Sequence, residues 1–274
     1  MEVLYVSHPI QTENKKPEVM AMGFFDGIHL GHQELLLQAK SIAERKDAVF
    51  SVMTFDPHPM EVLTGKARKF ITPLPEKIAK MEKFGVEKMY IMHFDKNFAS
   101  LEPDDFVLQY IVGMKIKHVV VGFDFTFGKK AKGTVADLRS KSEKGVFELS
   151  VIPKKTYKDQ KISSTIIRNF IQEGKVELIP YCLGASYSVK VTTQYNYEKS
   201  IIEMRPASNF LIPLEGFYFV EIINGQHRYT CKLEIVQDNK AGSKLVIHGL
   251  VPKLYDECEI VFLNRIAKIQ SLTV

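Results

Sequence analysis

The stretch Gly23-Phe24-Phe25-Asp26-Gly27-Ile28-His29-Leu30-Gly31-His32 connects a β-like apolar run, residues 18–24, to an amphipathic run, residues 31–46. We therefore expect a strand, a glycine-containing loop and a helix. Backbone N–H groups at a helix start, together with the helix dipole, form a site for anions. His29 and His32 lie three residues apart, so both rings can point the same way and donate to phosphate oxygens, while Gly31 allows a nucleotide to approach the backbone.

The same alternation continues along the first two-thirds of the chain. Strands are predicted at residues 18–24, 48–55, 88–94, 117–123 and 147–152, and helices at 31–46, 75–84, 103–112, 134–144 and 164–173. Apolar strands that alternate with helices predict an α/β, Rossmann-like fold with a parallel sheet covered on both faces. Ligands of such sheets bind beyond the carboxyl ends of the strands. The loops expected there are residues 25–32, 56–59 and 124–133.

The pattern changes near Gly184. Strands without intervening helices are predicted at residues 187–193, 200–204, 216–223, 227–236, 244–248 and 257–262. Asn224-Gly225 is a strong hairpin signal between two of them. We predict a small antiparallel barrel or sandwich, and therefore two domains, residues 1–184 and 185–274.

Composition limits the classes of function. The 274 residues carry a net charge of +5 and are 45% hydrophobic, as in globular proteins. No apolar run is long enough for a membrane helix, and residues 1–17 lack a secretory signal pattern. The three cysteines are widely spaced, which favours a reducing compartment over a disulfide framework or a zinc site. We expect a cytoplasmic protein with neither a nucleic-acid nor a membrane partner; the oligomeric state stays open.

Three further segments carry polar groups at the predicted edge. Ser163-Ser164-Thr165 places hydroxyls at a helix start, and Ser164 and Arg168 share a helix face. Spacing alone leaves simple capping and phosphate binding equally open. Asp56-Pro57-His58-Pro59 cannot continue a strand, so it predicts a stiff loop. In the segment of Phe123, Asp124, Phe125 and Phe127, about half of the phenylalanines are expected in the core.

These motifs, taken in order, resemble the bacterial bifunctional riboflavin kinase/FAD synthetases, whose first domain is a HIGH-type nucleotidyltransferase. The resemblance rests on the quoted stretch and on Thr54-Phe55-Asp56-Pro57-His58-Pro59, Val120 to Gly128, and Ile162-Ser163-Ser164-Thr165 with Arg168. It implies FMN adenylyltransferase activity with ATP and FMN as substrates and FAD and pyrophosphate as products. Mg²⁺ is expected to arrive mainly on ATP, since the motifs contain no carboxylate cluster for a protein-held metal.

The resemblance also implies roles for individual residues. His29, His32, Ser164 and Arg168 are expected to be catalytic, without a covalent intermediate. The ATP site is expected to comprise Gly23, Phe24, Phe25, Asp26, Gly27, His29, Gly31, His32, Ser163, Ser164, Thr165 and Arg168. The FMN site is expected to comprise Asp56, Pro57, His58, Pro59, Phe123, Asp124, Phe125 and Phe127. Phe24 departs from the family, which has asparagine there, and is expected to leave a polar contact missing or to join the core.

The second domain resembles a riboflavin kinase barrel that lacks the catalytic groups. Residues 190–197 replace a glycine- and arginine-rich stretch, and Ala207 stands where the family has a metal-binding threonine. Val246 or Ile247 stands at the catalytic glutamate. We predict a barrel without kinase activity. The alternatives are a working bifunctional enzyme, an adenylyl- or cytidylyltransferase with another substrate, and a non-catalytic flavin-binding regulator.

Overall fold

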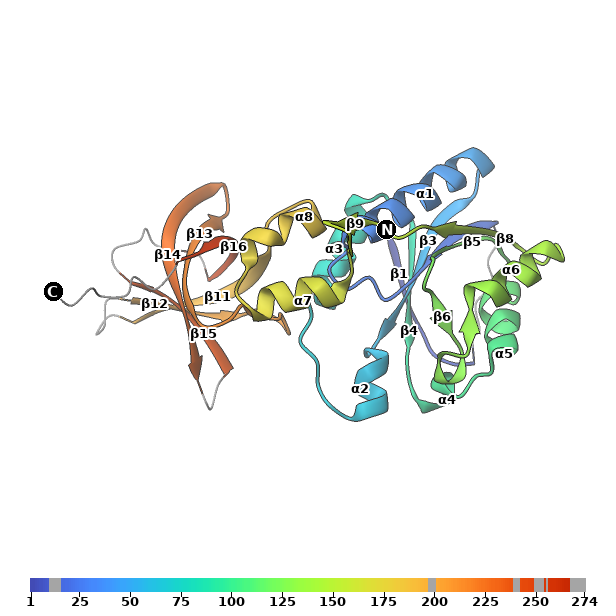
Figure 1. Cartoon of the computed structure of the whole chain (residues 1–274), viewed down its shortest axis with the longest axis horizontal. Coiled ribbons are helices and arrows are strands. Elements are labelled where there is room, and N and C mark those ends of the chain that lie inside the picture. Colours follow the sequence, from blue (N-terminus) through green and yellow to red (C-terminus); the bar gives the residue numbers. More distant parts are fainter. Residues whose placement is uncertain (10–15, 197–200, 239–241, 249–253, 255, 267–274) are drawn as a thin grey trace. The chain divides into compact units, whose positions relative to one another are not determined.

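The alternating apolar runs form a six-stranded parallel sheet in the computed structural model of the chain (Figure 1). The structure describes residues 1–9, 16–196, 201–238, 242–248, 254 and 256–266. The sheet comprises β1 (Glu2–Val6), β2 (Glu18–Met22), β3 (Val49–Asp56), β4 (Lys88–His93), β5 (Ile116–Gly122) and β8 (Glu148–Ile152). The predicted strands are confirmed to within two residues, and β1 is an edge strand that the sequence analysis did not predict.

Helices separate these strands in the chain. They are α1 (Leu30–Lys46), α2 (Pro59–Thr64), α3 (Leu74–Lys83), α4 (Lys96–Ala99), α5 (Pro103–Val107) and α6 (Val135–Glu143). The helix predicted at residues 103–112 is divided into α5 and the π-helix η1 (Leu108–Val112). The loop after β5 contains a short hairpin of β6 (Thr126–Phe127) and β7 (Gly133–Thr134), with the 3-10 turn η2 (Lys129–Ala131) between them.

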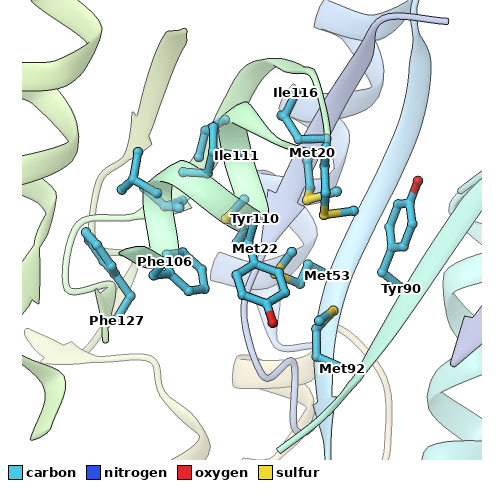
Figure 2. Packing of buried hydrophobic residues seen from close by; sticks show 14 of the residues in the cluster. Met20, Met22, Met53, Tyr90, Met92, Phe106, Tyr110, Ile111, Ile116 and Phe127 are labelled. Atoms are coloured by element: carbon cyan, nitrogen blue, oxygen red, sulfur yellow. The ribbon is translucent and has the colours of Figure 1, made fainter. Parts of the chain in front are cut away.

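Each face of the sheet has its own hydrophobic core, because successive side chains of a strand point to opposite faces. Val19 and Ala21 of β2 join a cluster with α1 and α3, whereas Met20 and Met22 join one with α5 and η1. Figure 2 shows the second cluster, in which methionines lie beside the rings of Phe106 and Tyr110. Unbranched methionines fill the irregular space between strands and rings. The parallel sheet covered on both faces is therefore confirmed.

The strand order brings the predicted loops to one region. It is β1-β4-β3-β2-β5-β8, so β2 lies between β3 and β5. The chain adds strands on the β3 side first and then crosses to the β5 side, which makes the β2–β5 boundary the switch point of the sheet. The loops after β2, β3 and β5 leave the same edge from three adjacent strands. These are the loops in which the sequence analysis placed most of the site.

The C-terminal strands close into an antiparallel barrel in the order β11-β12-β15-β14-β13-β16. Its strands are β11 (Ser188–Asn196), β12 (Ile201–Pro206), β13 (Gly216–Asn224), β14 (His227–Asp238), β15 (Gly242–His248) and β16 (Glu257–Arg265). The predicted hairpin is present: Asn224 pairs with His227, and Gly225 turns the chain with φ 63°. Residues 197 and 200, which the predicted segments included, lie outside the described residues.

The compact units divide the chain before the barrel begins. Unit 1 comprises Met1–Arg68 and Leu74–Thr156, and unit 2 comprises Lys69–Pro73 and Tyr157–Val274. The division falls inside β9 (Thr156–Tyr157). Besides the barrel, unit 2 contains β10 (Gln160–Lys161), α7 (Ser164–Gln172), η3 (Val176–Leu178) and α8 (Pro180–Leu183).

Hydrogen bonds explain this grouping. The guanidinium of Arg265 donates to the carbonyl oxygens of Glu173 at 3.3 Å and Glu215 at 2.8 Å, and the backbone N–H of Leu214 donates to the carbonyl of Ile171 at 3.1 Å. Two boundaries therefore differ in position. The change of sequence pattern near residue 184 comes directly after α8, whereas the compact units divide between Thr156 and Tyr157.

Candidate functional site

The loop from Gly23 to His29 holds an unusual backbone conformation. Phe25, Gly27 and Ile28 have φ of 58°, 85° and 45°, a region that a branched residue such as Ile28 rarely adopts. The side chains of Phe25 and Ile28 are buried, at 0% and 2% exposure, and so hold the loop in place. Phe25 can therefore meet a nucleotide only through its backbone.

The two histidines of the motif lie against each other. Their rings stack with centroids 3.6 Å apart and planes 16° apart, which confirms that both point the same way. His29 is the N-cap of α1, and its Nδ1 accepts a hydrogen bond from the backbone N–H of His32 at 3.3 Å. In neutral His29 the ring proton is then on Nε2, so Nε2 is the donor atom of the ring.

Gly31 lies directly against the His29 ring. A Cβ at position 31 would lie 3.3 Å from Cε1 and Nδ1 of the His29 ring. Such a contact is tighter than ordinary van der Waals packing, so a side chain here would push the His29 ring from its position. The structure adds this steric reason to the close approach that the sequence predicted for Gly31.

The Asp56–Pro59 loop packs against the first loop through aromatic side chains. His58 caps α2: its Nδ1 accepts from the N–H of Met60 at 2.9 Å, and its own N–H donates to Glu61 at 3.1 Å. The His58 ring meets the ring of Phe24 edge-on, with centroids 4.1 Å apart. Phe24 is only partly buried and belongs to neither hydrophobic cluster of the sheet, so it is not a core residue but joins two loops of the site.

The loop after β5 divides its phenylalanines as expected. Phe127 is buried at 6% exposure in the second core cluster, and Phe125 packs against that cluster. Phe123 is 40% exposed and Asp124 is also exposed, so these two are the members of the segment available to a ligand.

Lys77, which the sequence analysis did not single out, lies against the loop that carries the histidine motif. Its side chain is buried at 2% exposure, and its Nζ donates to the carbonyl oxygen of Phe24 at 2.7 Å. Nζ also lies 3.4 Å from the hydroxyl of Thr54 and 4.0 Å from the centroid of the Phe24 ring. Burial lowers the pKa of Lys77 from 10.5 to about 8, and the carboxylates of Asp26 and Asp56 oppose this shift. The sequence held one indication of this role: Lys77 stands at a position of the predicted helix where the apolar spacing calls for a core residue.

The pKa of Asp56 is shifted by burial and by the charges around it. Desolvation raises the pKa of its carboxyl, the Lys77 cation lowers it, the Glu61 carboxylate raises it and His93 lowers it. The edge at the carboxyl ends of β2 and β3 therefore combines a buried cation with two carboxylates, next to the stacked histidines. Buried charges among perturbed titratable groups are characteristic of functional sites.

Comparison with known proteins agrees with this geometry. A family model described as FAD synthetase matches residues 11–166, more than half of the chain. The chain belongs to the FAD synthetase family. As a member of the family it is an enzyme, a nucleotidyltransferase.

Similar proteins cover both units of this FAD synthetase family member. A bifunctional riboflavin kinase/FMN adenylyltransferase of Listeria monocytogenes is 42% identical over 82% of this chain and 75% of its own length. A protein named FAD synthetase from the same species is 30% identical over 78% of this chain and 85% of its own length. The crystal structure of a macrolide-efflux protein from Streptococcus pneumoniae has a TM-score of 0.84 and 26% identity, covering 99% of this chain and 94% of that one.

The remaining predicted ATP residues of this FAD synthetase family member belong to unit 2. Ser163 is the N-cap of α7, and its hydroxyl accepts from the N–H of Ile166 at 3.4 Å. Ser164 and Thr165 form the first turn of the helix, and Arg168 follows one turn later. Ser163 therefore caps the helix. Phosphate binding stays the prediction for Ser164 and Arg168.

The barrel residues that the sequence analysis compared with kinase positions are Ala207, Val246 and Ile247. Val246 and Ile247 are buried apolar residues of β15, at 5% and 2% exposure, and no carboxylate is available from either. Ala207 lines an open cavity of about 750 Å³ in unit 2 together with Arg205, Ser208 and Asn209.

Across the ranges that the structure describes, no cluster of three or more His, Cys, Asp or Glu side chains is arranged to hold a metal ion. Among the helices of those ranges, none has the length and apolar character needed to cross a membrane. Cys182, Cys231 and Cys258 are free thiols.

Proposed function

We propose that this chain transfers the AMP moiety of ATP to the phosphate of FMN, giving FAD and pyrophosphate, and does not phosphorylate riboflavin. The observation that carries the first part is the stacked His29–His32 pair at the switch point of the sheet. Nucleotidyl transfer needs positioning and donors aimed at the developing charge more than it needs a covalent intermediate. A terminal phosphate oxygen of FMN forms a bond to the α-phosphorus of ATP while the bond to the pyrophosphate oxygen breaks.

The proposed roles follow from the local contacts. Nε2 of His29 donates to the α-phosphate, because Nδ1 is occupied by the N–H of His32. Ser164 and Arg168 steady the β- and γ-phosphates, an assignment that rests on their sequence motif and on their spacing of one turn along α7. Mg²⁺ enters on ATP as part of the substrate. The remaining residues assigned to ATP, from Gly23 to Gly27 with Ser163 and Thr165, contribute mainly backbone and hydroxyl groups.

The flavin is proposed to lie at the neighbouring loops of the same edge. Phe123 offers an exposed aromatic face, which suits the isoalloxazine ring, and Asp124 beside it offers a carboxylate to the ring or the ribityl chain. Asp56 to Pro59 are proposed to border the phosphate end of FMN. The absence of kinase activity is supported by the apolar Val246 and Ile247 and by Ala207, none of which supplies a base or a metal ligand.

One assay tests both parts of the proposal. The purified chain is incubated with Mg²⁺-ATP and either FMN or riboflavin, and FMN, FAD and pyrophosphate are quantified. We expect FAD and pyrophosphate in equal amounts from FMN, and no FMN from riboflavin. Rapid conversion of riboflavin to FMN would show that the enzyme is bifunctional. The relatives named as bifunctional enzymes support this alternative. No product from either flavin would favour a flavin-binding regulator.

A further inference from the structure

The carbonyl oxygen of Phe24 is held by two side chains from different elements. The Thr54 hydroxyl of β3 donates to it at 3.0 Å, and Nζ of Lys77 in α3 donates to it at 2.7 Å. Phe24 is the second residue after β2, at the start of the loop that ends at His29. The position of this carbonyl therefore sets where the loop, and with it the histidine pair, leaves the sheet.

The burial of Lys77 is costly and calls for a reason beyond packing. A charged ammonium at 2% exposure has lost nearly all of its hydration, and an apolar side chain of similar volume would fill the same space without that cost. Its cation faces the carboxylates of Asp26 in the β2–α1 loop and Asp56 at the end of β3. It compensates two negative charges at an edge where an anionic substrate must bind.

We propose that Lys77 is a positioning residue of adenylyl transfer, whose ammonium group holds the Phe24 carbonyl and offsets Asp26 and Asp56 so that the histidine loop keeps its geometry beside the phosphates. This inference rests on the proposed function. Lys77 acts through Phe24 and the loop and does not touch the substrate. The charged and titratable groups around it are Asp26 and Asp56, with Glu61 and His93 acting on Asp56 and the His58 ring packed on Phe24.

The protonation of Lys77 provides a readout that a purely structural lysine would not. Because its pKa is lowered to about 8, the ammonium is present at pH 7 and is lost as the pH rises through that value. The second ionisation of a phosphate monoester has a pKa of about 6, so it is nearly complete at pH 8. A decline of kcat above about pH 8 is therefore expected from Lys77 and not from FMN or ATP.

Three variants of the full chain separate the possibilities. Lys77→Met removes the charge and keeps an unbranched stem, Lys77→Arg keeps a positive charge throughout pH 6–10, and Lys83→Met makes the same change at an exposed position of α3. Displacing catalytic groups by about 1 Å can cost on the order of 100-fold in rate. For Lys77→Met we expect kcat at pH 7 to fall at least about 10-fold, with a smaller change in KM and no decline above pH 8. Lys77→Arg should regain part of the rate and also lack the decline, and Lys83→Met should match the unmodified chain.

The proposal fails if Lys77→Met retains kcat within a factor of two or shows the same alkaline decline as the unmodified chain. It also fails if the only effect is a lower midpoint of urea unfolding. Should Lys77→Met not fold, Thr54→Val removes the second donor to the Phe24 carbonyl and is expected to lower kcat in the same direction. Unchanged kcat in Thr54→Val together with an alkaline decline in Lys77→Arg would then overturn it.

Binding of Mg²⁺-ATP distinguishes failure of this inference from failure of the proposed function. If the unmodified chain makes no FAD at any pH, the proposed function is wrong, and Lys77 is judged by the ATP affinity measured by calorimetry at pH 7 and pH 9. Weaker binding at pH 9 in the unmodified chain, but not in Lys77→Arg, supports the role of the ammonium. Equal affinities at both pH values contradict it.

Discussion

At the residue scale, His29 combines two tasks that a single substitution would mix. Its Nδ1 caps α1 by accepting from the N–H of His32, and its Nε2 is the proposed donor to the phosphate. His29→Ala removes both, and His29→Asn keeps a side-chain acceptor suited to an N-cap but has no imidazole. The two variants therefore separate a structural effect from a catalytic one.

We expect either variant to lower kcat/KM for FAD synthesis by about 10²–10³-fold, equivalent to about 2.7–4 kcal/mol, as for the loss of an oxyanion donor. Only His29→Ala should also lose about 1 kcal/mol of stability through the cap. Steady-state kinetics and urea unfolding measure the two effects. A His29→Asn variant with the full rate would mean that capping is the whole contribution of His29.

The sequence predicted the arrangement of some site residues and not that of others. The motif predicted that His29 and His32 point the same way, and the stacked rings confirm it. For Lys77 the sequence predicted only a position in a helix. The partners of its buried ammonium are Phe24 and Thr54, which lie 53 and 23 positions away in the chain. No local pattern reports such contacts.

At the scale of elements, the pairing of β5 with β8 carries a buried histidine. His118 of β5 is 7% exposed, its Nε2 lies 2.8 Å from the hydroxyl of Ser150, and its Nδ1 lies 3.2 Å from the carboxylate of Glu148. Burial lowers the pKa of His118 below 6.5, Glu148 raises it, and Lys46 lowers it. The neutral ring is thus the form that the folded sheet favours.

This lowered pKa predicts how stability depends on pH. The unfolded chain binds the proton more readily than the folded one, so the contribution of His118 is present above about pH 6.5 and is lost as the pH falls through the lower folded value. Urea unfolding at pH 7.5 and 5.5 should show a smaller loss of stability in His118→Gln than in the unmodified chain. His227→Gln, at an exposed position of β14, is the matched control and should leave the loss unchanged. If His118→Gln lost as much stability between pH 7.5 and 5.5 as the unmodified chain, His118 would not be the cause of the loss.

Elements with strong periodicity were the ones predicted best. Apolar spacing identified α1 and all the inner strands of the sheet, and alternation identified the six barrel strands. The edge strand β1 and the short helix α2 were missed, because β1 is mostly exposed or half-buried and α2 buries no residue, so neither shows a clear apolar face. The π-helical turn η1 was predicted as ordinary helix, because its five residues make about one turn, too short for the different period of a π-helix to show in the sequence.

At the scale of the whole molecule, the question is which unit holds FMN. A ligand at 100 times its Kd adds about 2.7 kcal/mol to the free energy of unfolding. We expect Phe123→Ser, in the exposed loop after β5, to reduce this FMN-dependent gain at a fixed FMN concentration. Arg205→Ala, in the lining of the barrel cavity, should keep it. Urea unfolding with and without FMN is the measurement, and the opposite pattern would place FMN in the barrel.

The sequence by itself determined the kinds of elements, their order and the chemistry of the motifs, because periodicity and turn residues act over a few neighbouring positions. Only the tertiary structure decided the strand order that sets the loops after β2, β3 and β5 side by side, the burial of Lys77 beneath Phe24, and the grouping of residues 157–183 with the barrel. Each of these depends on pairing between residues far apart in the chain. Such pairing is settled by the competition for buried surface and hydrogen bonds across the whole fold.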